Sequence, residues 1–166
     1  MYINPAITTL LPQAAKTLRG WIMDAFQARK ERLKGELHRA NSKISFSFDL
    51  WTSPNHLALL GLVAHYIDEF GYNQSTIFGL RRLHGAHSGE NQAEIICEII
   101  KEYKLSPNKI GWFVTDNATN NDTAIDIALK TLLPSLTTKQ RLGRRLRCLG
   151  HVINPAAKAF LSRTQR

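Results

Sequence analysis

The 166-residue sequence predicts an α/β fold with a mixed sheet, in which a three-stranded antiparallel meander is joined by parallel strands and flanked by helices. An N-terminal helical segment is expected to precede this sheet. Two observations predict the fold. Apolar residues recur with a period of two over residues 44–51 and are followed by two more short apolar runs. A helical pattern then precedes a fourth run at residues 110–116, and a crossover helix lets a strand return parallel to an earlier one.

The central strand is expected at residues 44–51, where one side is apolar. Ile44, Phe46, Phe48 and Leu50 alternate with Ser45, Ser47, Asp49 and Trp51. A carboxylate at the end of such a strand must be solvated, hydrogen-bonded or bound to a cation, which makes Asp49 the first candidate for a functional residue. By itself, Asp49 is better explained as a surface acid or as a cap for the turn at residues 52–55.

The elements on either side follow from periodicity. Apolar residues spaced near 3.6 over residues 13–38 predict an amphipathic helix, or two, that ends near Ala40. Residues 57–67 and 75–83 are typical of the second and third strands. We interpret His65, which stands among apolar neighbours, as a hydrogen-bonded histidine of the sheet rather than a ligand.

The second half of the chain is expected to alternate helix, strand and helix. Ser88 is a candidate cap for a helix that ends before Pro107 and buries Cys97 as a core thiol. The nearly unbroken apolar run at residues 110–116 predicts a strand buried on both faces. Residues 123–133 are expected to form the next helix.

Composition and charge limit the classes of protein to which the chain could belong. Hydrophobic content of 43%, no apolar run long enough to span a bilayer, and no signal-peptide pattern at the N-terminus favour a globular protein that is neither secreted nor in a membrane. Two cysteines favour a reducing compartment. Residues 1–40 hold 7 basic and 3 acidic side chains, residues 41–136 hold 7 and 10, and residues 137–166 hold 8 and none. This pattern suits either a polyanion held between basic flanks or a solvated surface with a basic tail.

Asp49 and Asp116 each end a predicted strand, one before and one after the crossover helix. On neighbouring parallel strands, about 4.8 Å apart, the two carboxylates could share a divalent cation or bracket a pair of cations about 3.5–4 Å apart. Asp122 and Asp126 are the only later acids. We expect them to serve as a helix cap and as solvated surface residues.

Four blocks of sequence then point to a family. They are Phe48-Asp49-Leu50-Trp51-Thr52-Ser53, His87-Ser88-Gly89-Glu90-Asn91, Val114-Thr115-Asp116-Asn117-Ala118 with Asn120-Asn121, and Arg147-Cys148-Leu149-Gly150-His151-Val152-Ile153-Asn154. In this order and spacing they resemble the hAT superfamily of DNA transposases. The resemblance implies a helical linker segment at residues 1–40 and a partial RNase H-like core at residues 41–166.

The resemblance also implies a site and its partners. Asp49 and Asp116 match the first two acids of the family's Asp-Asp-Glu set, which holds Mg²⁺, or Mn²⁺, for DNA cleavage and strand transfer. Cys148 and His151 match the family's Cys-x-x-His block near the DNA, and a zinc site there lacks a second ligand pair. The implied partners are DNA and a full-length transposase rather than a membrane or a small-molecule substrate, and the implied location is the nucleus.

Two further features bear on function, a cluster of arginines and the absence of a third acid. Four arginines without acidic neighbours in sequence are expected to bind DNA phosphates: Arg141, Arg144, Arg145 and Arg147. The family's third acid, a glutamate, has no counterpart, because no Asp or Glu follows Asp126. Two carboxylates are expected to hold Mg²⁺ weakly. Three interpretations stay open: a transposase fragment unable to cleave DNA alone, a non-catalytic module that binds DNA or another transposase, and a nuclease with an unconventional third acid.

Overall fold

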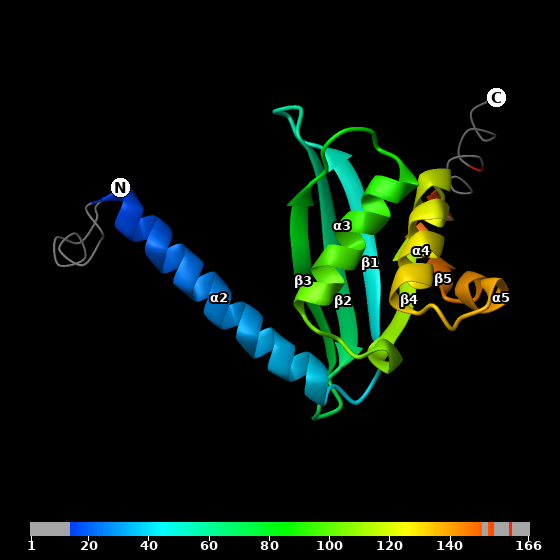
Figure 1. Ribbon diagram of the computed structural model, residues 1–166, viewed down its shortest axis with the longest axis horizontal. Helices are drawn as coiled ribbons and strands as arrows, with labels where there is room; N and C mark the ends of the chain where they lie inside the picture. The colour runs from blue at the N-terminus through cyan, green and yellow to red at the C-terminus, as the bar shows by residue number, and fades with distance from the viewer. Residues whose placement is uncertain (1–13, 151–152, 155–159, 161–166) are drawn as a thin grey trace. The chain divides into compact units, whose positions relative to one another are not determined.

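The computed structural model describes residues 14–150, 153–154 and 160, and its centre is a five-stranded mixed sheet (Figure 1). The strands are β1 (Ile44–Thr52), β2 (Ala58–Ile67), β3 (Asn73–Arg82), β4 (Ile110–Thr115) and β5 (Arg145–Arg147). The helices are α2 (Ala15–Arg39), α3 (Gly89–Glu102), α4 (Thr119–Leu132) and α5 (Thr138–Leu142), with a 3₁₀ turn, η1, at Pro107–Lys109. The predicted α/β class is confirmed.

The strand order is β3-β2-β1-β4-β5. Strands β1, β2 and β3 form an antiparallel meander, with Phe46 opposite Ala64 and Leu62 opposite Gly79. Strand β4 returns parallel to β1, and the short strand β5 lies parallel to β4 at the edge of the sheet. The crossover between β3 and β4 is helix α3, as its capped start at Ser88 predicted, since the Ser88 hydroxyl accepts a hydrogen bond from the Asn91 backbone.

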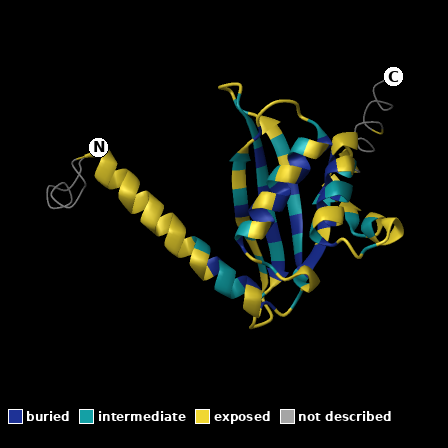
Figure 2. Cartoon of the chain, viewed as in Figure 1, coloured by how far each residue is buried: buried dark blue, intermediate teal, exposed yellow. Residues whose placement is uncertain are grey.

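Helices α3 and α4 cover one face of the sheet, which we call the covered face (Figures 1 and 2). Alternate strand residues point into it, and Phe46 lies 5.3 Å, between ring centroids, from both Phe78 and Phe113. Helix α3 approaches β3 closely, because a Cβ placed on Gly79 would lie 2.7 Å from Ile99 Cγ2. Cys97 is buried here as expected, and burial raises the pKa of its thiol.

The opposite face, which we call the open face, differs from expectation. The apolar run of β4 predicted burial on both faces, yet Trp112 is 43% exposed and Ile77 on β3 is 75% exposed. An unbroken apolar run allows a strand to be buried on both faces of a sheet. Within the described residues, however, helices cover only one face. His65 lies on this face in the predicted role, with its ring nitrogens 2.8 Å from Ser47 Oγ and Ser75 Oγ.

The start of one helix also differs from expectation. Helix α4 begins at Thr119, four residues earlier than predicted, and Ala118 occupies the cap position without a side-chain hydrogen bond, so the expected capping role of Asp122 is wrong. Helix α2 is a single helix, and the chain divides into two units between Glu36 and Leu37. Among the described residues, no helix is both long and apolar enough to cross a membrane.

Candidate functional site

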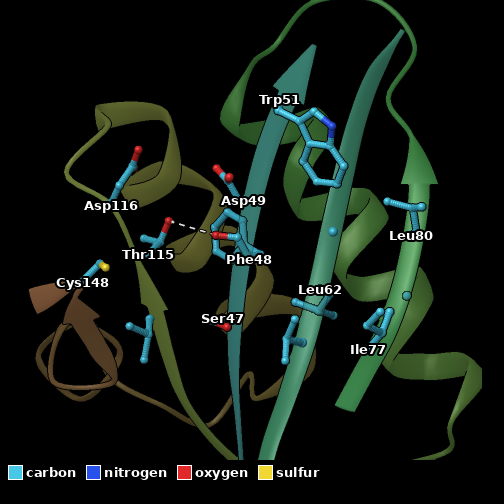
Figure 3. Close-up of a pocket in the computed structure, with 14 residues that line it drawn as sticks. Ser47, Phe48, Asp49, Trp51, Leu62, Ile77, Leu80, Thr115, Asp116 and Cys148 are labelled. Carbon is cyan, nitrogen blue, oxygen red and sulfur yellow. Dashed lines mark hydrogen bonds between the residues drawn. The ribbon is translucent and has the colours of Figure 1, made fainter. Parts of the chain in front are cut away.

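The two predicted acids lie toward the carboxyl ends of neighbouring parallel strands, Asp49 three residues before the end of β1 and Asp116 directly after β4. Ser47 pairs with Val114, and each of these residues stands two positions before an acid, so Asp49 of β1 and Asp116 just after β4 are at matching heights. Figure 3 shows both side chains at this end of the sheet. The placement predicted from the strand ends is therefore confirmed.

Asp49 is exposed, and its surroundings leave it accessible. Its Oδ1 atom accepts a hydrogen bond of 2.9 Å from the backbone amide of the next residue, Leu50. The following turn is capped by Ser53 instead, whose hydroxyl accepts from the Leu57 amide at 3.2 Å. The interpretation of Asp49 as the cap of that turn is wrong.

Asp116 is half-buried and is held by several donors. Its Oδ1 atom accepts hydrogen bonds from the Ala118 amide at 3.0 Å and from Asn121 Nδ2 at 2.6 Å. Asn121 Nδ2 also lies 2.9 Å from the Thr115 hydroxyl, and that hydroxyl donates to the Phe48 carbonyl at 3.5 Å (Figure 3). A buried network thus joins Asp116 to the backbone of β1 beside Asp49.

Thr115 and Asn121 have no role predicted from the sequence. Both were inside the third motif block, but the polar run at residues 117–122 suggested only helix capping. The available signal was the five-residue spacing between Asp116 and Asn121, because a helix that begins immediately after the strand turns such a residue back toward the strand end.

A groove of about 480 Å³ lies on the open face and is lined by residues from this end of the sheet (Figure 3). Its lining is mainly apolar, and Asp49 and Asp116 are its charged side chains. Cys148 also lines it, because its backbone amide donates to the Thr115 carbonyl at 2.7 Å and brings the end of β5 beside Asp116. His151, the other member of the Cys-x-x-His block, lies outside the described residues.

The donor chemistry of the two acids fits a hard divalent cation. Carboxylate oxygens suit Mg²⁺ and Mn²⁺, which commonly keep several water ligands beside one or two carboxylates. The part of the chain that the structure describes contains no cluster of three or more His, Cys, Asp or Glu side chains suited to a metal. Asp49 and Asp116 are therefore two candidate ligands, and among the described residues they are not part of a larger cluster of this kind.

Two of the four predicted DNA-binding arginines, Arg141 and Arg144, instead make contacts within the fold that attach α5 and the residues after it to the rest of the domain. Arg141 Nε lies 2.6 Å from Asp126 Oδ1, and its Nη1 donates to the Leu136 carbonyl at 2.9 Å. Arg144 Nη1 donates to the Ile110 carbonyl at 2.7 Å. Asp126 is therefore an ion-pair partner whose side chain is still 44% exposed to solvent.

The other two arginines anchor β5 to α4. Arg145, whose side chain is 12% exposed, pairs with Asp122, and Arg147 lies 3.7 Å from the same carboxylate. Burial lowers the pKa of Arg145, as does the neighbouring Arg147, while Asp116 raises it. An arginine remains a cation at neutral pH despite such a shift. Because these cations are already paired, DNA binding by the arginines stays a prediction, and Arg147, with 48% of its side chain exposed, is the more accessible of the pair.

The five-stranded mixed sheet with flanking helices is consistent with an RNase H-like domain. Residues 47–143, more than half of the chain, match the family model described as the ZBED1 RNase-like domain. The chain therefore belongs to that family.

The relatives agree with the resemblance to hAT transposases. The chain is 28% identical over 148 residues to the "Putative AC transposase" of Zea mays, which covers 88% of this chain and 18% of that protein. It is 25% identical over 156 residues to the "Putative transcriptional regulator tpeD" of Talaromyces stipitatus, covering 94% and 18%. It is 21% identical over 169 residues to the "Zinc finger BED domain-containing protein RICESLEEPER 2" of Oryza sativa subsp. japonica, covering 96% and 23%. The chain spans about a fifth of the length of these curated relatives.

Proposed function

We propose that this chain is the part of a hAT-type transposase core in which Asp49 and Asp116 bind a divalent cation next to a DNA phosphate. The observation that carries the proposal is the register of β1 and β4, which puts both acids at the same end of neighbouring parallel strands. The family match and the transposase relatives support the class of protein.

The two acids have different parts in this proposal. Asp116 supplies an oriented ligand because donors hold one of its oxygens, whereas Asp49 supplies an exposed ligand that adjusts to the cation. A bound Mg²⁺ or Mn²⁺ supplies Lewis-acid activation of a water or a 3′-hydroxyl and stabilisation of the leaving oxygen.

We expect the 166-residue chain alone not to cleave or join DNA. The sequence has no Asp or Glu after Asp126, and Asp122 and Asp126 are occupied by arginines. Two carboxylates hold a cation weakly, and positioning two cations for in-line attack takes a fuller set of ligands. A full-length transposase is a partner that could contribute the third acid.

Two experiments test the proposal. Titration with Mn²⁺ should give weak binding that Asp49→Asn and Asp116→Asn each reduce, while Glu94→Gln on the exposed side of α3 leaves it unchanged. Equal binding by all four proteins would overturn the metal site. Supercoiled plasmid with Mg²⁺ or Mn²⁺ should stay intact, and nicking that Asp49→Asn abolishes would instead support a nuclease with an unconventional third acid.

DNA binding is the second part of the proposal. The net charge of +9 and the exposed side chains of Lys139 and Arg147 favour weak, salt-sensitive binding with little sequence preference. DNA binding without any Mn²⁺ binding would favour the alternative, a non-catalytic module that binds DNA or another transposase. A nuclear location follows from either version.

A further inference from the structure

A buried amide lies directly behind Asp116. Asn121, the third residue of α4, is 7% exposed and belongs to the few polar residues buried among the described ones. Its Nδ2 group has two hydrogens and two acceptors, Asp116 Oδ1 at 2.6 Å and Thr115 Oγ1 at 2.9 Å. Both donor positions of this nitrogen are therefore used within the site.

We infer that Asn121 is a positioning residue that fixes Asp116 so that its Oδ2 atom is presented to a divalent cation. Oδ1 already accepts two hydrogen bonds, from Asn121 and from the Ala118 amide. Since a carboxylate oxygen has two lone-pair sites, Oδ2 is the oxygen with free capacity. This inference rests on the proposed metal role of Asp116, and it assigns Asn121 as the residue that orients this ligand.

The same amide links the two strands of the site. Thr115 Oγ1 accepts from Asn121 and donates to the Phe48 carbonyl, so a shift of Asn121 would be transmitted to the residue before Asp49. The first turn of α4 also packs closely against the start of α3. A Cβ placed on Gly89 would lie only 2.7 Å from the Asn120 carbonyl oxygen, so the two backbones are nearly in contact there. Asn121 therefore acts from a rigid position, as orientation of a metal ligand requires.

The competing explanation is that Asn121 only satisfies buried polar groups. Such a role would affect folding stability but not the affinity of the site for a cation. Asn121→Leu removes the donor at similar size, and Thr115→Val removes the link to β1 but keeps the bond to Asp116. Asn120→Ala is the matched control, because that exposed amide donates to the His87 carbonyl and contacts neither acid.

Mn²⁺ titration of the four proteins, followed by water-proton relaxation, separates these explanations. Loss of a residue that orients a metal ligand typically costs about 10- to 100-fold in affinity. We expect a loss of about this size for Asn121→Leu, a smaller loss for Thr115→Val, and none for Asn120→Ala. A folded Asn121→Leu protein that binds Mn²⁺ as tightly as the wild type would overturn the inference.

A metal-free measurement keeps the inference testable if Asn121→Leu does not fold. In the wild-type protein, the side-chain amide of Asn121 should give a slowly exchanging NMR signal that shifts in Asp116→Ala and not in Asp49→Ala. A signal insensitive to Asp116→Ala would overturn the inference even if the wild type binds Mn²⁺. An intact bond in a protein that binds no Mn²⁺ would instead overturn the proposed metal site and, with it, the role of Asn121 toward a cation.

Discussion

The two faces of the sheet differ in how far their side chains are buried, and the candidate site has contacts on both faces. Helices α3 and α4 lie over the covered face (Figure 2), and Phe46 and Phe113 of its strands are fully buried. On the open face, Ile77 lines the groove and is 75% exposed, and Trp112 of β4 is 43% exposed. Asp116 is anchored from the helix side by Asn121, while Asp49 faces the groove with a single backbone bond. The helix side of the site therefore holds Asp116 in one orientation, and the groove side leaves Asp49 accessible to a ligand.

The largest expected effect tests this contrast between neighbouring residues of β4. Phe113→Ala should lower the free energy of unfolding by about 3–5 kcal/mol, because a fully buried ring leaves a cavity between Phe46 and the helices. Trp112→Ala, one position earlier on the open face, should cost at most about 1 kcal/mol, as a largely surface change. Urea unfolding measures both, and similar losses would mean that the open face is covered in solution.

The next effect concerns the attachment of β5 to α4. Asp122→Asn removes the carboxylate that pairs with Arg145 and Arg147, and Arg145 is then left mostly buried without that partner. We expect a loss between the about 1 kcal/mol of an exposed pair and the about 3 kcal/mol of a buried one. Glu102→Gln, which breaks a half-exposed pair with Arg81, is the control and should cost less. A larger loss for Glu102→Gln in urea unfolding would contradict the anchoring role of Asp122.

The sequence predicted the sheet and the positions of the acids because both depend on local pattern. The period of two over residues 44–51 and the crossover helix determined which strand ends meet, so Asp49 and Asp116 were found together. The partners of the arginines could not be predicted in the same way. Asp122 and Arg145 are 23 residues apart in sequence, and only the packing of β5 against α4 brings their charges together.

Burial was the other property that local pattern did not determine. The apolar run of β4 has the composition of a strand covered twice, and composition does not say whether a second layer is present. Asn121 was missed for a related reason. Asparagine early in a helix usually caps it, and its inward orientation depends on where α4 begins, which is four residues before the predicted start.

A smaller effect distinguishes anchoring arginines from those that reach DNA. Arg147→Ala should reduce the salt slope of DNA binding by about 1, as loss of one phosphate contact does, because almost half of its side chain is exposed. Arg145→Met should leave the slope nearly unchanged and instead lower stability, because its guanidinium is enclosed and paired with Asp122. Fluorescence anisotropy between low and physiological salt measures the slope, and an equal change in both variants would contradict the distinction.

The smallest effect is kinetic and compares the two cysteines. Cys97 is a buried residue of α3 whose thiol lies against α4, and burial raises the pKa of this thiol, so less of the reactive thiolate is present at pH 8. Cys148 lines the groove on the open face and is half-exposed. We expect a disulfide reagent such as DTNB to modify one thiol quickly in the folded protein and two in urea, and Cys148→Ser to abolish the fast phase. A fast phase that persists in Cys148→Ser would show that α3 and α4 separate readily, and that the covered face is less rigid than its packing indicates.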